Sequence, residues 1–175
     1  MPGKKLNIEI KARCKDPERI RRILKGQKAK FIGTDKQTDT YFKVPKGRLK
    51  LREGTIENAL IYYERKNAKG PKRSDYVLVK IREGSNLRKL LAGALAVLVV
   101  VKKTREIYFI GNIKFHIDRV VGLGSFVEVE AMRKARQSES DLLKQCRSYI
   151  KMFNIRNKDL ISGSYSDMLL NKMSD

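Results

Sequence analysis

The sequence predicts an α+β fold in which short antiparallel strands form a barrel or sharply curved sheet with helices outside it. Three observations support this class. Apolar and charged residues alternate with a period of two along most of the chain, which is typical of half-buried strands. Turns rich in glycine, proline and asparagine separate these segments, as in successive hairpins. We count roughly eight or nine strands, and antiparallel sheets of this size usually close or fold over.

The N-terminal half contains a strand, a helix and four further strands. Every second residue of the first strand, residues 6–12, is apolar. Asp16 can cap a helix that has Pro17 in its first position and ends at about Lys25-Gly26. Turn signals then delimit strands at residues 36–43, 48–52, 59–66 and 75–81.

The C-terminal half begins with a helix that Ser85 can cap and that runs to about Ala96. We assign its leucines, and the apolar stretch 90–101 as a whole, to the core. Residues 97–110 are β-branched and then alternating, and Gly111-Asn112 forms a hairpin turn. Strands at 113–118 and 126–130, a helix from Ser138 or Ser140 to about Phe153, and a helical tail at 166–172 complete the chain. We find no internal repeat or linker, so we predict one domain, 1–175.

The composition indicates a polyanionic partner. Of the 175 residues, 41% are hydrophobic, and 40 Lys and Arg against 19 Asp and Glu give a net charge of +21. Nucleic acid, an acidic membrane surface or phosphorylated small molecules fit such a charge. Two cysteines cannot form a disulfide framework, and the chain start has no apolar core of signal-peptide length. The twelve apolar residues 90–101 are too few to span a bilayer. We therefore expect a cytoplasmic protein with no membrane partner.

The charged faces of the predicted strands carry both signs. If the sheet closes with helices outside, the apolar face packs outward and the charged face lines the interior. Such an interior needs a ligand that satisfies both signs, because unpaired charges away from water are costly. A phosphate chain with a divalent metal does so, since carboxylates bind Mg²⁺ or Mn²⁺ while Lys and Arg bind phosphate oxygens. The residues concerned are Glu9, Lys11, Lys50, Arg52, Lys103, Arg105, Asp118, Glu128 and Glu130.

Six motifs in one order resemble the CYTH superfamily, the triphosphate tunnel metalloenzymes, which includes class IV adenylyl cyclases and thiamine triphosphatases. Asn7-Ile-Glu9-Ile-Lys11 resembles the family's ExExK signature. The resemblance covers about residues 6–132, and the tail at 164–167 fits as well. The other matching segments are Gln37-Thr-Asp39-Thr-Tyr41-Phe42, Lys50-Leu-Arg52, Tyr63-Glu64-Arg65, Lys103-Thr-Arg105, and His116-Ile-Asp118 with Leu123-Gly-Ser-Phe-Val-Glu128-Val-Glu130.

This resemblance implies a closed eight-stranded antiparallel β-barrel, or tunnel, with a triphosphate along its axis and peripheral helices. By position it implies metal ligands at Glu9, Asp118, Glu128 and Glu130. It implies catalytic groups at Glu9, Lys11, Arg105 and Asp118. It implies substrate contacts from Lys11, Tyr41, Lys50, Arg52, Arg65, Lys103 and Arg105.

The implied reaction is that of a class IV adenylyl cyclase, from ATP to cyclic AMP and pyrophosphate, with Mg²⁺ or Mn²⁺. The N-x-E-x-K form and the YERxN strand are similar to cyclase-like members. Hydrolysis of tripolyphosphate or thiamine triphosphate is the alternative. Asn7 departs from the family pattern: its amide oxygen can ligate a hard cation but brings no charge. The number of metals, and whether the triphosphate is turned over or only bound, therefore stay open.

A nucleic-acid-binding module is the rival from another class, because the net charge and the strand tyrosines suit it. Four acids on the proposed binding face would repel phosphates without metal, so we do not expect nucleic acid there. A homodimer stays open. His116, the only histidine, lies on the Asp118 face and could touch substrate, but a lone histidine is more often structural or exposed. We expect Lys72 to be solvated in a loop.

Overall fold

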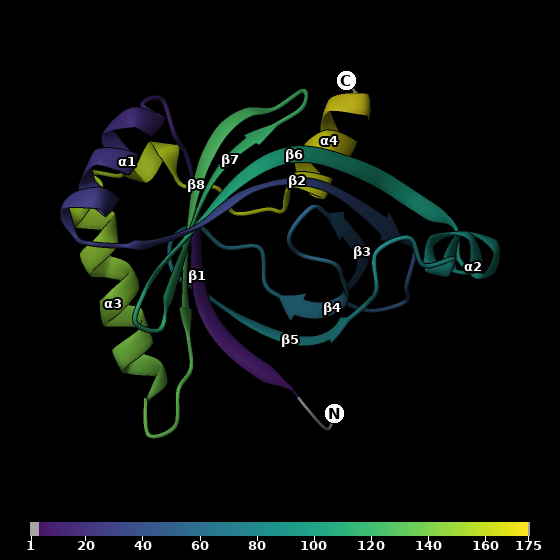
Figure 1. Ribbon diagram of the computed structural model, residues 1–175, viewed down its shortest axis with the longest axis horizontal. Helices are drawn as coiled ribbons and strands as arrows, with labels where there is room; N and C mark the ends of the chain where they lie inside the picture. Colours follow the sequence, from purple (N-terminus) through teal and green to yellow (C-terminus); the bar gives the residue numbers. More distant parts are fainter. Residues whose placement is uncertain (1–3, 175) are drawn as a thin grey trace.

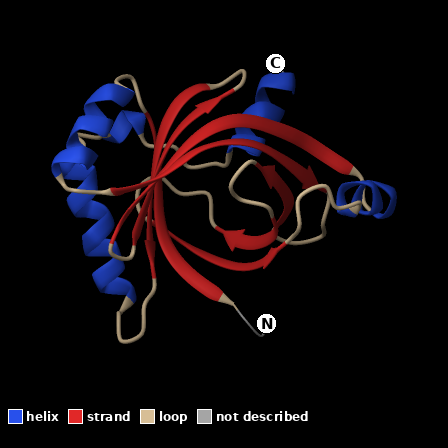
Figure 2. Ribbon diagram, viewed as in Figure 1, coloured by secondary structure: helices blue, strands red, loops and turns tan. Residues whose placement is uncertain are grey.

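Residues 4–174, the part described by this computed structural model, form one antiparallel sheet of eight strands that closes into a barrel (Figures 1 and 2). Around the barrel the strands follow the order β1-β5-β4-β3-β2-β6-β7-β8, and β8 pairs again with β1. The α+β class and the closed eight-stranded tunnel are thereby confirmed. The strands are β1 (Lys5–Arg13), β2 (Lys30–Phe42), β3 (Arg48–Gly54), β4 (Ala59–Arg65), β5 (Lys72–Lys80), β6 (Val97–Ile110), β7 (Ile113–Val120) and β8 (Gly124–Met132).

The main hydrophobic core lies outside the barrel. Helices α1 (Pro17–Gly26) and α3 (Glu139–Met152) cover the outer face of β1, β7 and β8, on the left of Figure 1. Alternate residues such as Ile8 on β1 and Phe115 on β7 pack there against Leu24 and Leu142 of the helices, and all four are fully buried. Because successive strand residues face opposite sides, the charged residues between them point into the barrel.

Side-chain caps fix where these two helices begin. The Asp16 carboxylate accepts a hydrogen bond from the Arg19 backbone N–H at 3.0 Å, with Pro17 in the first turn as the sequence predicts. Ser138 and Asp141 form a reciprocal capping box at the start of α3.

A second buried cluster lies among inward-facing residues, where Tyr41, Val101 and Phe126 meet Tyr165. Tyr165 is the first residue of α4 (Tyr165–Ser174), which follows a short 3₁₀ turn, η1 (Asn157–Asp159). Among the described residues no helix combines the length and apolar composition needed to cross a lipid bilayer.

Several predicted boundaries change. Strand β2 begins at Lys30 rather than residue 36, and β5 begins at Lys72 rather than 75. Helix α2 is shorter than predicted, Leu87–Ala94, and its N-cap is Asn86 rather than Ser85. The β2 extension contains Gly33, beside which the pairing with β6 is irregular, and the β5 extension, Lys72-Arg73-Ser74, is polar throughout. Neither extension shows the alternation that marks a strand.

The assignment of the apolar stretch 90–101 to the core is wrong for most of its length. Leu90 is 64% exposed and Val97 is 46% exposed, whereas Val101 is fully buried. The helices α1 and α3 cover only one side of the barrel, and α2 lies at the opposite end (Figure 1, right). Within residues 4–174, no layer like that of α1 and α3 covers the outward residues of this half.

Candidate active site

The barrel encloses a cavity of about 320 Å³ to which every strand contributes side chains. Ten of the eleven predicted site residues line it, and Asp118 is the exception. The closed alternation explains this convergence, since positions two apart on each strand face the same interior. The ten are Glu9, Lys11, Tyr41, Lys50, Arg52, Arg65, Lys103, Arg105, Glu128 and Glu130.

Three basic side chains converge on the buried carboxylate of Asp39. Arg52 donates two hydrogen bonds to it, at 2.9 and 3.0 Å, while Lys50 and Lys103 lie 3.0 and 2.7 Å away. Burial disfavours the charged carboxylate, but attraction to Arg52, Lys103 and Lys50 outweighs burial and holds the pKa of Asp39 well below its usual value. Burial lowers the pKa of Lys103 to about 7. Attraction to Asp39 opposes this shift, and repulsion of the ammonium group by Arg52 and Arg105 adds to it.

Arg105 lies at the centre of a second buried network. Its guanidinium donates to both oxygens of Asp118, at 2.7 and 2.5 Å, and to Glu128 at 2.7 Å. Lys11 lies 2.9 Å from the other Glu128 oxygen and 3.5 Å from the centre of the Tyr165 ring. The Tyr165 hydroxyl donates to Asp118 at 2.7 Å. Asp118 is thus placed behind Arg105, outside the cavity lining, and its predicted role as a metal ligand stays a prediction.

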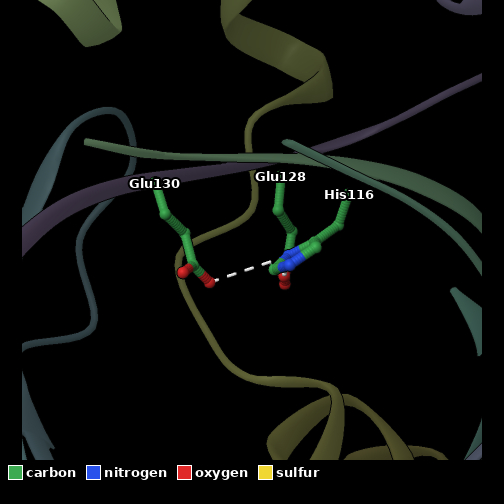
Figure 3. A group of neighbouring side chains, drawn as sticks. All are labelled: His116, Glu128 and Glu130. Atoms are coloured by element: carbon green, nitrogen blue, oxygen red, sulfur yellow. Dashed lines mark hydrogen bonds and ion pairs between the residues drawn. The ribbon is translucent and has the colours of Figure 1, made fainter. Parts of the chain in front are cut away.

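His116, Glu128 and Glu130 form a compact group of potential metal ligands (Figure 3). One ligand atom from each lies within 4.8 Å of the others. His116 Nδ1 is 3.1 Å from Glu128 and 3.7 Å from Glu130, because His116 on β7 is directly opposite Glu128 on β8. Burial lowers the pKa of His116 to about 3, so the imidazole is neutral and can offer a lone pair.

The acid on β1 adjoins this group. Glu9 is directly opposite Glu130 across the β1–β8 pair, the pair that closes the barrel. Burial raises the pKa of Glu130 to about 7; attraction to Lys114 and Arg105 opposes this shift, and repulsion from Glu9 and Glu128 adds to it. Such a cluster of acids suits a divalent cation, which relieves their mutual repulsion. The donor set therefore fits the metal that the sequence predicts.

Three polar groups around this cluster are buried without a hydrogen-bond partner in the part of the chain that the structure describes. They are the Asn7 amide oxygen, two nitrogens of the Arg65 guanidinium and His116 Nε2. Arg65 also pairs with Glu9 through its third nitrogen. Buried polar groups are normally satisfied, so unpaired donors and acceptors in a cavity indicate a place for a ligand.

The site includes residues that the sequence analysis did not assign. His116 is buried and lines the cavity beside the acids, so it is not exposed, and a structural role is untested. Glu57 bridges Arg52 at 2.9 Å and Lys114 at 2.5 Å across the cavity. Asp39 and His116 each lie two residues from an assigned site residue, so alternation alone could have placed them in the cavity. Glu57 lies in a turn, where no periodic signal exists.

Lys72 is buried rather than solvated. Its ammonium group donates to the backbone oxygens of Ala68, Ile161 and Ser162 at 3.1, 2.7 and 3.2 Å. Burial lowers its pKa to about 8. Lys72 thus ties the start of β5 to the segment before α4, a long-range contact that local sequence does not reveal.

Comparison with known proteins identifies the family. Residues 5–165 match the CYTH domain. The chain belongs to the CYTH family. This family consists of adenylyl cyclase-like and triphosphatase-like enzymes that depend on metal.

Relatives of this CYTH protein match it over nearly their whole length. MJ0240 of Methanocaldococcus jannaschii, provisionally named an adenylate cyclase, is 26% identical over 171 residues, which cover 93% of this chain and 98% of the relative. The structure of PH1012 from Pyrococcus horikoshii has a TM-score of 0.80 at 25% identity, over 92% of this chain and 98% of its own. HpAC1 from Hippeastrum, provisionally named an adenylyl cyclase, has a TM-score of 0.62 at 14% identity. The match covers 97% of this chain and 96% of HpAC1, and it shows that the two share a fold.

Proposed function

We propose that this protein is a divalent-metal-dependent enzyme that converts a nucleoside triphosphate to a cyclic nucleotide and pyrophosphate, as a class IV adenylyl cyclase does. One observation carries the proposal. Nine basic side chains and the His116–Glu128–Glu130 group line the same barrel cavity. A triphosphate with a divalent cation supplies both the negative and the positive charge that such a lining requires.

The basic residues form two groups that can grip successive phosphates. Lys50, Arg52 and Lys103 surround Asp39 on one side, while Lys11 and Arg105 meet at Glu128 on the other. Arg65 has two nitrogens free of partners within residues 4–174. Charge-assisted hydrogen bonds from these groups hold the phosphate oxygens and stabilise the charge that develops during the reaction.

The metal would be held by Glu128, Glu130 and His116, with Glu9 beside them and the Asn7 amide oxygen next along the same face of β1. A divalent cation bound here polarises phosphoryl oxygens as a Lewis acid. Glu9 accepts the proton of the attacking hydroxyl through a carboxylate oxygen that does not ligate the cation. The ribose 3′-oxygen then forms a bond to the α-phosphorus, the bond to the bridging oxygen breaks, and pyrophosphate leaves.

An apolar part of the cavity supports an organic triphosphate over inorganic triphosphate. Ile61, Tyr63, Tyr76 and Leu78 on β4 and β5 contribute to the lining, and Leu78 is 39% exposed. Aromatic and aliphatic side chains of this kind can pack against a nucleobase. The name of the relative MJ0240 agrees with a cyclase.

Hydrolysis of the terminal phosphate is the second candidate. It requires the same grip, with water rather than the ribose oxygen as the nucleophile and the terminal phosphorus as its target. HpAC1, which shares the fold, is described as having a dominant triphosphatase activity, and this favours keeping the candidate.

Product analysis tests the proposal. The protein is incubated with ATP, thiamine triphosphate and inorganic triphosphate, each with Mg²⁺ or Mn²⁺, and the products are identified by phosphorus NMR. The Glu128→Gln variant serves as the control for a contaminating activity. Cyclic AMP and pyrophosphate from ATP are expected. Inorganic phosphate as the only new product would favour the hydrolase, and no product from any substrate would contradict both enzymatic candidates.

A further inference from the structure

The barrel cavity accounts for little of the net charge. Nine Lys and Arg and five Asp and Glu line it, so the cavity contributes +4 of the +21. A net +17 therefore lies elsewhere in the protein. Charge of this size destabilises the compact state by self-repulsion and favours association with polyanions, and a triphosphate inside the barrel does not explain it.

Nearly half of this surplus lies in the helical layer outside the barrel. Residues 15–30 contain seven Lys and Arg and two acids, and residues 139–158 contain five Lys and Arg and two acids. Together the two segments carry +8. They comprise α1, α3 and the residues that flank them, and the two helices share one core on the left of Figure 1. A hydrogen bond from Arg19 to the Phe153 backbone oxygen, at 2.9 Å, joins the two segments.

We define the basic helical face by six exposed residues of this layer. None of the six forms a salt bridge or a side-chain hydrogen bond with any part of the chain between residues 4 and 174. Five of them recur three or four residues apart within α1 or α3, a spacing at which like charges destabilise a helix, and Lys28 follows the end of α1. The six are Arg22, Lys25, Lys28, Lys144, Arg147 and Lys151.

We propose that the basic helical face binds the phosphate backbone of nucleic acid, at a site separate from the barrel cavity. Along α3 the three cations follow one another at about 5–6 Å by helix rise, a spacing that suits the closely spaced phosphates of a nucleic acid strand. Contacts to phosphates carry no sequence information, so binding is independent of base sequence. Of the acids that argued against nucleic acid, Glu9, Glu128 and Glu130 line the cavity and Asp118 is buried behind Arg105, so none belongs to this surface.

The packing of the two helices favours nucleic acid over a lipid surface. A helix that binds a membrane surface inserts its apolar face among the lipids. The apolar faces of α1 and α3 are already buried against the barrel, through Ile20 and Leu24 on one helix and Leu142 and Cys146 on the other. Charge attraction is then the main force available to the face.

The test measures binding of a fluorescent DNA duplex of about 20 base pairs by anisotropy, between about 50 and 200 mM salt. The duplex has 5′-hydroxyl ends, so the result does not depend on triphosphate chemistry or on the proposed enzyme activity. We expect affinity that falls steeply with salt, that changes little with base sequence, and that inorganic triphosphate in the cavity does not abolish.

The deciding variant is the triple substitution Lys144→Glu, Arg147→Glu, Lys151→Glu. Its matched control is Lys69→Glu, Arg82→Glu, Lys89→Glu, three exposed residues outside the helical layer. The triple variant of the basic helical face should bind the duplex at least tenfold more weakly, and the control less than threefold more weakly. The slope of log affinity against log salt concentration should be about 2.7 less steep for the triple variant of the face than for wild type. Circular dichroism checks that both variants fold.

Three results would overturn the proposal. Equal losses in the two variants would mean that diffuse charge, and not this face, binds the duplex. Absence of duplex binding at the lowest salt would exclude nucleic acid as the partner. Binding to phosphatidylserine vesicles without binding to the duplex would assign the face to a membrane.

Discussion

The protonation state of Lys103 should change when a ligand binds inside the barrel near neutral pH. Its pKa is lowered to about 7 by burial and by Arg52 and Arg105. A bound triphosphate brings negative charge, which raises the Lys103 pKa, so formation of the complex above pH 7 takes up a proton. Affinity for ATP should therefore fall as pH rises above 7, by up to about tenfold per unit.

Calorimetry in two buffers of different ionisation enthalpy measures this proton uptake. Wild-type protein should take up close to one proton at pH 8, and Lys103→Met should take up correspondingly less. Identical proton uptake in the two proteins would show that another group titrates.

Arg105 and Lys103 are two apart on β6, yet their removal should affect stability differently. Arg105→Ala leaves Asp118 buried without the cation that holds both of its oxygens, which costs about 3–5 kcal/mol. Lys103→Met leaves Asp39 with Lys50 and Arg52 and should cost within about 1 kcal/mol. Urea unfolding of both variants measures the difference, and equal losses would contradict this account of Asp118.

A substitution at Asn7 tests the metal site by adding a charged ligand. Asn7 lines the cavity two residues before Glu9 on β1, and its buried amide oxygen lacks a partner within the described chain. Asn7→Asp adds a charged ligand beside Glu9 and should increase Mn²⁺ affinity. Calorimetric titration with Mn²⁺ measures it, with Asn7→Ala as the control that removes the oxygen. Weaker binding by Asn7→Asp than by wild type would show that the extra charge only adds repulsion among the acids.

The sequence predicted which residues enter the site better than it predicted what each contacts. Alternation places Glu9, Lys103 and Glu128 on inward faces whatever the register. It does not show that Asp118 lies behind Arg105 or that Glu57 reaches across the cavity, because those contacts depend on strand order and on a turn. The place of His116 two residues before Asp118 on the same strand indicated that it could face the interior, but alternation does not show that it is buried against Glu128.

At the scale of elements, the uneven helical covering determines which apolar residues stabilise the fold. Leu24 on α1 is fully buried, while Leu90 on α2 is 64% exposed. Leu24→Ala should cost about 2–5 kcal/mol, because it removes buried methyl groups and leaves a cavity. Leu90→Ala should change stability by less than about 0.5 kcal/mol. Urea denaturation compares them, and a large loss for Leu90→Ala would mean that α2 is packed in solution.

The same contrast explains where element prediction succeeded. The helix at Pro17 has a proline, an N-cap and an apolar stripe that agree, and its bounds are confirmed. The stretch 90–101 has only hydrophobicity, which the sequence analysis equated with burial. Whether an apolar stripe is buried depends on which side of the barrel the helices cover, and no local pattern contains that information.

At the scale of the whole molecule, closure of the barrel gives the sheet a polar inner face and an apolar outer face, the reverse of an ordinary β-sandwich. The apolar core lies between barrel and helices, and the polar interior holds the ion-pair networks. Strand count and two-sided charge alternation predicted this arrangement. The β1–β8 pairing completes it and brings Glu9 directly opposite Glu130.

The central claim is that acids from β1 and β8 share one cation inside the closed barrel. It is tested most directly by Mn²⁺ titration followed by electron paramagnetic resonance, for wild type, Glu9→Gln and Glu128→Gln, with the exposed Glu18→Gln as control. Each substitution keeps the side-chain shape and removes one charge. We predict that both site variants lose about tenfold or more in Mn²⁺ affinity while the control binds as wild type does. Unchanged affinity in both site variants would contradict the claim.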